Sequence, residues 1–72
     1  MIPVTSTVLK AIGHDPEQNI LRTEFHTGQT YEHAGVDEST HAELMSADSI
    51  GRHFNNHIMG KYPSKRVWWI TQ

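Results

Sequence analysis

Residues 27–58 read TGQTYEHAGVDESTHAELMSADSIGRHFNNHI, and this stretch decides the fold. It starts with a glycine turn, because Gly28 can take the positive φ that a tight hairpin connection requires. Residues 29–33 then alternate, which predicts a strand that presents Tyr31 and His33 on one face. The stretch therefore begins as the second half of a β-hairpin.

The second part of the stretch changes from the period of a strand to that of a helix. Asp37 is placed to cap a helix over about residues 37–46, where an acidic first turn also suits the helix dipole. Ser49 offers a second N-cap and predicts another helix over about residues 49–59. The apolar residues of that helix recur every four positions, at Ile50, Phe54 and Ile58. Two short amphipathic helices are therefore expected.

Two further strands are predicted upstream of the hairpin turn. Residues 6–13 are rich in β-branched and aliphatic side chains, and residues 19–26 alternate in the manner of a half-buried strand. With residues 29–33 they form a three-stranded antiparallel meander. The expected fold is α+β, with this N-terminal meander packed against the two helices over residues 1–62. Residues 63–72 form a basic and aromatic tail that adds an extra strand or a flexible segment.

The chain has 72 residues and no cysteine. A single domain of this size buries only about 60% of the surface that its unfolded chain exposes. Without cysteine it has neither a disulfide nor a thiolate ligand for zinc. No apolar run approaches the roughly 20 residues of a membrane span, and the N-terminus lacks the pattern of a signal peptide. We therefore expect a cytoplasmic protein that does not act at a membrane.

Charge is unevenly distributed along the chain. Residues 1–50 contain all eight acidic residues and two basic ones, a net charge of −6, whereas residues 51–72 contain four basic residues and no acid. Interleaved with those four cations are the aromatic residues Phe54, Tyr62, Trp68 and Trp69. The asymmetry indicates a separate interaction face. The alternative is that helix ends and loops collect the cations without a functional reason.

The paired tryptophans of the tail point to a partner. On a strand, Trp68 and Trp69 face opposite sides, so the core readily takes only one of them. The other is then exposed to a partner, unless both simply close the core. Trp, Tyr and Arg are enriched at interface hot spots. The candidate partner-binding residues are Arg52, Lys61, Tyr62, Lys65, Arg66, Trp68 and Trp69, with Tyr31 and His33 as secondary candidates.

A series of positions occurs in a characteristic order: Ser6, Asp15, Leu21, Phe25, Gly28, Tyr31, Val36, Leu44, Ala47, Ser49, Gly51, Phe54, Asn55, Ile58 and Tyr62. This order resembles the KTSC domain, a short bacterial and phage module named from the C-terminus of some lysyl-tRNA synthetases. The family pattern ends in Ala-x-Ser-x-Gly-x-aromatic-Phe-Asn-x-x-Ile and a tyrosine. The resemblance implies no established catalysis, and its tie to a synthetase implies a role in translation or transcription.

This chain departs from the family pattern at three histidines. His33 replaces the second tyrosine of a Tyr-x-Tyr strand, and His14 and His53 stand where aromatic residues are frequent. Any function that depends on tyrosine stacking is therefore in doubt at these sites. Ser49 and Asn55 are polar members of the pattern, and their simplest interpretation is a helix cap and an exposed or hydrogen-bonded helix position.

Catalytic and metal-binding signals are weak. His53 and His57 stand at i and i+4, a spacing that can present two imidazoles to zinc, but HFNNH lacks the glutamate of the HExxH motif and no third ligand is evident. There is no GxSxG nucleophile elbow and no glycine-rich phosphate loop. We therefore expect no metal, no cofactor, no small-molecule substrate and no enzymatic activity.

The expected function is binding. The first alternative is a small regulator, free-standing or phage-encoded, that docks its basic and aromatic C-terminal face on an acidic surface of a larger protein of the transcription or translation machinery. The second is direct binding of single-stranded RNA or other nucleic acid, with cations on phosphates and aromatic rings stacked on bases. The net charge of −6 over residues 1–50 disfavours the second alternative, unless the charges are separated in space.

Overall fold

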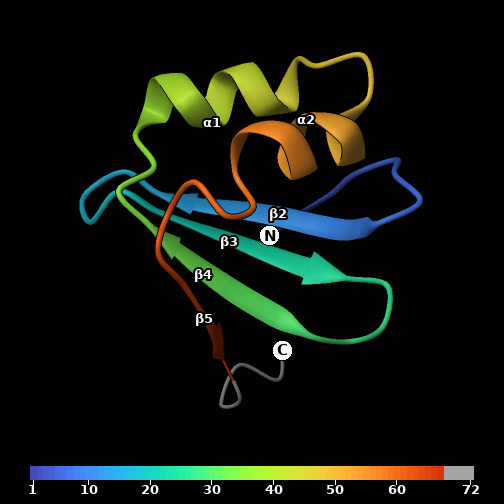
Figure 1. Cartoon of the computed structure of the whole chain (residues 1–72), viewed down its shortest axis with the longest axis horizontal. Helices are drawn as coiled ribbons and strands as arrows, with labels where there is room; N and C mark the ends of the chain where they lie inside the picture. The colour runs from blue at the N-terminus through green and yellow to red at the C-terminus, as the bar shows by residue number, and fades with distance from the viewer. Residues whose placement is uncertain (68–72) are drawn as a thin grey trace.

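The computed structural model describes residues 1–67, which form one five-stranded antiparallel sheet covered on one face by two helices (Figure 1). The elements are β1 (Ile2–Pro3), β2 (Leu9–Asp15), β3 (Ile20–Phe25), β4 (Thr30–Ala34), α1 (Glu38–Met45), α2 (Ile50–His57) and β5 (Ser64–Val67). The strands lie in chain order, β1-β2-β3-β4-β5. Within these described residues, no helix is long and apolar enough to cross a membrane.

The predicted α+β fold is confirmed, with small changes at its edges. The meander is β2, β3 and β4, paired antiparallel as expected. The first strand begins later than predicted, at Leu9, because Ser6 lies in a turn. Its Oγ accepts hydrogen bonds from the backbone N–H groups of Val8 and Leu9 at 3.1 and 3.2 Å. The short strand β1 was not predicted, since two residues carry no periodic pattern.

Of the two conformations expected for the C-terminal tail, an extra strand or a flexible segment, residues 64–67 form the strand. The chain turns at Gly60, which has φ +80°, and Pro63 O accepts the N–H of Ala34 at 2.9 Å. Strand β5 then pairs antiparallel with β4, so that Lys65 lies opposite Glu32. The tail therefore continues the sheet of residues 1–62. Trp68 and Trp69 lie outside the described residues.

Both helices begin at the predicted caps. Asp37 accepts the N–H of Thr40 at 2.9 Å, and this hydrogen bond lowers the pKa of the Asp37 carboxyl. Ser49 accepts the N–H of Arg52 at 3.4 Å. Each cap satisfies a backbone donor that the first helical turn cannot satisfy itself.

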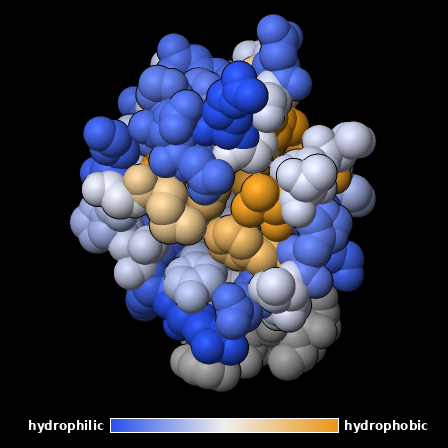
Figure 2. Space-filling view, turned by 45° about the vertical axis from the view of Figure 1, so that its right-hand side comes forward, coloured by the Kyte–Doolittle hydropathy of each residue, from blue (hydrophilic) through white to orange (hydrophobic). Residues whose placement is uncertain are grey.

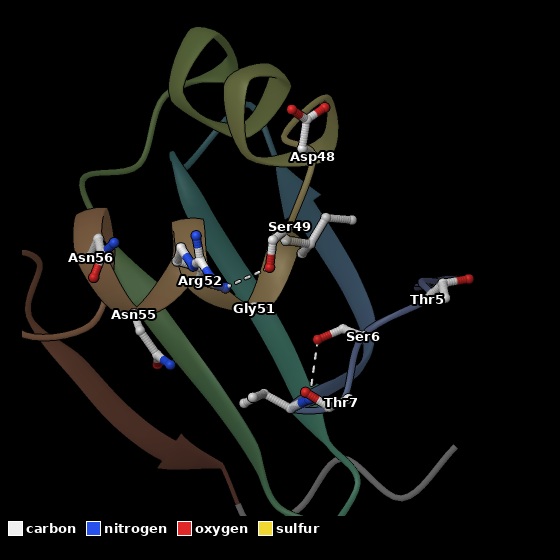
Figure 3. A pocket seen from close by; sticks show the side chains of 11 residues that line it. Thr5, Ser6, Thr7, Asp48, Ser49, Gly51, Arg52, Asn55 and Asn56 are labelled. Carbon is white, nitrogen blue, oxygen red and sulfur yellow. Dashed lines mark hydrogen bonds between the residues drawn. The ribbon is translucent and has the colours of Figure 1, made fainter.

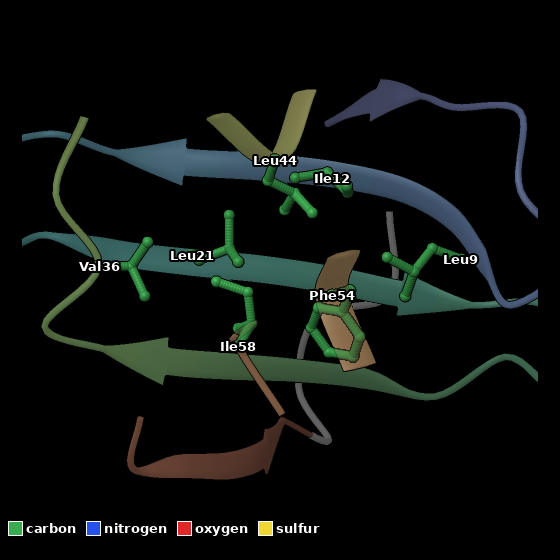
Figure 4. Close-up of a cluster of buried hydrophobic side chains, with 7 residues drawn as sticks. All are labelled: Leu9, Ile12, Leu21, Val36, Leu44, Phe54 and Ile58. Atoms are coloured by element: carbon green, nitrogen blue, oxygen red, sulfur yellow. The ribbon is translucent and has the colours of Figure 1, made fainter. Parts of the chain in front are cut away.

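The core lies between the sheet and the helices (Figure 4). It consists of fully buried apolar side chains from both layers: Leu9, Ile12, Leu21, Val36, Leu44, Phe54 and Ile58. Phe54 lies on α2 and Ile58 directly follows that helix as its C-cap, and both lie over the sheet in Figure 4, as their spacing of four predicts. Phe54 also makes edge-to-face contacts with Phe25 and His33, at ring-centroid distances of 5.8 and 5.3 Å. These contacts seat α2 on the sheet.

Gly51 allows the start of α2 to approach the β1–β2 loop. A Cβ at this position would lie 2.9 Å from Ser6 Oγ and 3.5 Å from Val8 Cγ2. The first distance is too short for a real contact, and Ser6 cannot move freely because its oxygen holds two backbone N–H groups. Glycine is therefore required here by close packing.

Replacing Gly51 tests this close approach. At a solvent-exposed position inside a helix, Gly→Ala stabilises the folded protein by about 1 kcal/mol, because alanine has the higher helix propensity. Here we expect Gly51→Ala to lower the free energy of unfolding by roughly 1–2 kcal/mol, because the new methyl group displaces Ser6 and disrupts its hydrogen bonds. Chemical denaturation measures the difference. In a Ser6→Ala background the penalty of Gly51→Ala should shrink, and an equal penalty in both backgrounds would contradict the contact.

His33 is a buried polar member of the core. Its side chain is 1% exposed and points to the helix face, where Nε2 hydrogen bonds with Thr23 Oγ1 at 2.9 Å. Its Nδ1 has no partner among the described residues. Burial lowers the pKa of His33 to about 4, because a charged imidazolium is poorly solvated there. The folded state therefore holds His33 neutral.

This burial predicts a loss of stability in mild acid. Below about pH 6.5 the unfolded chain binds a proton at His33 that the folded chain does not bind, so the free energy of unfolding falls as the pH is lowered toward 4. The pKa shift corresponds to about 3 kcal/mol over that range. Urea denaturation at several pH values should show a flatter profile for His33→Gln, which keeps a polar group near Thr23 but does not titrate. Identical profiles would contradict this account.

Candidate functional site

The structure brings two of the candidate cations together on the edge strand β5. Lys65 and Arg66 are both exposed there. They point to opposite faces of the sheet, because successive strand residues alternate. β5 is held on its inner side by β4. The two cations therefore occupy one edge of the sheet, and we call Lys65, Arg66 and the exposed Lys61 of the preceding turn the basic edge.

Lys65 belongs to a row of charges on the helix-free face. Arg22, Glu32 and Lys65 lie directly opposite one another across β3, β4 and β5. Arg22 Nε and Glu32 Oε2 are 2.7 Å apart, and Glu32 is only 7% exposed. The row therefore alternates in sign, and its exposed end at the sheet edge is positive.

Arg66 lies on the helix side of the sheet, opposite Tyr31 in the register. The Tyr31 ring packs edge-to-face on Phe25 at a centroid distance of 5.6 Å and is half-buried. Tyr31 therefore combines a structural contact with partial exposure beside a cation. His33, the other secondary candidate, is buried in the core and offers no surface to a partner.

Tyr62 and Arg52 occupy other places than the basic edge. Tyr62 is half-buried against the core and lies near Gly35, where an added Cβ would be 3.8 Å from its Cδ1. Arg52 is exposed on the first turn of α2 and lines a groove. The structure therefore does not bring all the predicted candidates together: Lys61, Lys65 and Arg66 form the basic edge, Arg52 lines the groove, and Tyr62 belongs to neither surface. Trp68 and Trp69 lie outside the described residues.

Three of the eight acidic residues of the chain lie on helix α1 or cap it. Glu38 and Glu43 lie on α1, and Asp37 caps it. Helix α1 lies over β2, where the ring of His41 stacks on that of His14 at a centroid distance of 4.7 Å. Since β2 and β5 are separated by β3 and β4 in the sheet, the acidic helix and the basic edge are separated in space, as Figure 1 shows.

The groove beside Arg52 was not predicted from the sequence. It has a volume of about 510 Å³ and lies between the β1–β2 loop, the α1–α2 turn and α2 (Figure 3). Its lining includes Ser6, Ser49, Gly51 and Asn55, all of which match the family pattern described above. Each of these residues, taken singly, has a local structural role. The groove is recognised only because the fold brings them together. The available signal was that these four positions outside the apolar core all belong to one family pattern, although Ser6 lies far in the sequence from the other three.

Titratable groups elsewhere do not assemble into a reactive centre. The rings of His53 and His57 lie 4.5 Å apart on α2, but within residues 1–67 no three His, Cys, Asp or Glu side chains come together as metal ligands. Burial and the neighbouring His14 lower the pKa of His41, whose Nε2 has no described partner.

Comparison with known proteins places these features in a family. Residues 5–62 match the model of the KTSC domain. A protein from Stutzerimonas stutzeri is 43% identical over 69 residues, covering 96% of this chain and 94% of that protein. A lysine–tRNA ligase from Nostoc punctiforme is 36% identical over 61 residues, which are 85% of this chain and 11% of the ligase.

The fold is also shared with a solved structure. The crystal structure of a KTSC domain protein from Yersinia pestis superposes with a TM-score of 0.86 at 39% sequence identity, covering 92% of this chain and 93% of the other. The family match, the relatives and the shared fold agree over the region from the β1–β2 loop to Tyr62. This chain belongs to the KTSC domain family.

Proposed function

We propose that this chain is a non-catalytic binding module that docks its basic edge on an acidic surface of a larger protein. The observation that carries the proposal is the separation of charge across the fold. Lys65 and Arg66 are exposed at one edge of the sheet, while the acidic helix α1 lies over the strands near the other edge. An acidic partner is attracted to the first surface and repelled by the second, which fixes its orientation.

The edge position of β5 supports the same conclusion. One side of its backbone pairs with β4, and within residues 1–67 no strand pairs with the other side. Such an edge can accept an added strand from a partner. Charged side chains on edge strands discourage indiscriminate pairing, so Lys65 and Arg66 favour a partner that carries complementary acids.

A relative supports a role beside the translation machinery. The Nostoc punctiforme protein that matches this chain over 11% of its own length is a lysine–tRNA ligase. A homologous module therefore exists as part of a larger enzyme of translation. We propose that this chain acts as a regulator on a large protein of translation or transcription, in a bacterial or phage setting and in the cytoplasm.

Direct binding of single-stranded RNA is the alternative function of the same cations. A phosphate backbone is best matched by a continuous track of cations. On the helix-free face the cations are interrupted, because Glu32 lies between Arg22 and Lys65. A polyanion would meet repulsion from Glu32 within this row, which is why the protein partner is proposed first.

The proposal predicts the effect of reversing the charge of the basic edge. A photo-cross-linking residue in place of the exposed Ser64, beside the two cations of β5, should capture a specific host protein, and the purified partner should bind the chain. Lys65→Glu with Arg66→Glu should weaken that binding by about tenfold or more, because two favourable charge contacts become repulsive. Isothermal titration calorimetry at two salt concentrations measures the change.

The matched control is Lys10→Glu, which reverses an exposed lysine on β2, away from β5. It should leave the affinity within about twofold, as expected for a charge outside the interface. Equal losses in the control and the double variant would contradict docking at the basic edge. Tighter, salt-dependent binding of labelled oligouridine that is lost in the double variant would instead favour the RNA alternative.

A further inference from the structure

We infer that the polar groove at the start of α2 binds an extended peptide segment in which an acidic residue adjoins an aliphatic one. This site lies apart from the basic edge, and its residues do not overlap with Lys61, Lys65 or Arg66. It is built by three separate parts of the chain, the β1–β2 loop, the α1–α2 turn and α2 (Figure 3).

The walls of the groove are fixed before any ligand arrives. The Ser6 carbonyl accepts the Nε2–H of His26 at 2.8 Å, and Ser6 Oγ accepts two N–H groups of its own loop. Gly51 brings α2 against this loop, because any larger residue would contact Ser6. A preformed site loses less conformational entropy on binding than a flexible one.

The groove presents unused hydrogen-bonding groups. Ser6 Oγ and Ser49 Oγ already accept backbone N–H groups, so each hydroxyl hydrogen is left to donate. In Figure 3 the side chain of Asn55 extends from α2 on the side where Ser6 and Thr7 lie. An asparagine amide both donates and accepts, which matches the C=O and N–H of a peptide bond.

Charge selects an acidic residue in the ligand. Arg52 lines the groove, is exposed, and makes no side-chain ion pair with another residue of the described chain. The carboxylate of Asp48 points away from Ser6 and Asn55 in Figure 3. A guanidinium binds a carboxylate through two parallel hydrogen bonds.

Apolar side chains of the groove select the neighbouring residue of the ligand. Val8 and Ile50 contribute to the lining, and both are only partly buried against the core. Figure 2 turns this end of the molecule forward and shows hydrophobic groups framed by hydrophilic surface. Aliphatic walls suit an aliphatic side chain, whereas unstacked bases bind on aromatic rings, and within residues 1–67 no aromatic residue lines this groove. A peptide therefore fits better than RNA.

The experiment is an NMR titration of the ¹⁵N-labelled full chain with the blocked tetrapeptide acetyl-Gly-Asp-Leu-Gly-amide. Chemical shifts of the amides of residues 5–8 and 49–56 should change, with a dissociation constant of about 1 mM, as expected for a short ligand. Peptides with Asn or Lys in place of Asp should bind at least about tenfold more weakly, because they cannot pair with Arg52.

Two variants place the site. Arg52→Gln and Asn55→Ala change exposed positions of α2, so the fold is retained. Each should lower the affinity for the acidic peptide by about tenfold. Lys65→Gln on β5 should leave the affinity unchanged, which separates this test from that of the basic edge. The inference is overturned by an absence of shifts, by equal binding of the Lys peptide, by unaltered affinity in both variants, or by a stronger response of the same amides to oligouridine.

Discussion

Helix α2 lies so close to the β1–β2 loop that no side chain fits at Gly51, and this close approach determines where the later parts of the chain sit. Phe54 and Ile58 are fully buried against the sheet. Their packing fixes the distance of α2 from the sheet and its orientation about the helix axis. The start of α2 then forms one wall of the polar groove. Its end leads through Gly60 into the turn that delivers β5 to the edge of the sheet. Both surfaces that we assign to binding therefore depend on how one short helix is seated.

Two separate contact surfaces suit a small module that works on a larger protein. In the proposed docking, the cations of the basic edge attract an acidic surface over a distance and align it, because the acidic helix α1 lies elsewhere on the fold. The groove offers directional hydrogen bonds and one guanidinium, which act only at short range. In our proposal, the basic edge supplies orientation and the groove supplies specificity.

Sequence patterns predicted the elements that depend on local chemistry. The caps Asp37 and Ser49 and the alternation from Leu21 to Phe25 follow from hydrogen bonding and periodicity, and the structure agrees. Strand β1 was missed because its two residues are ordered only by pairing with β2. The groove was missed because Ser6 and Asn55 are far apart in the chain, and each has an ordinary local role. The burial of His33 beneath Phe54 likewise depends on tertiary packing, which no local pattern encodes.

Amide hydrogen exchange of the chain, free and bound to the partner captured through position 64, tests the central claim most directly. The account predicts that binding slows exchange at residues 64–67 of β5 and at the groove residues 49–56, while β1 and α1 exchange as in the free chain. Such a pattern requires that both surfaces set by α2 contact the partner. Protection confined to α1 and the β1 edge, with β5 and the groove unchanged, would contradict it.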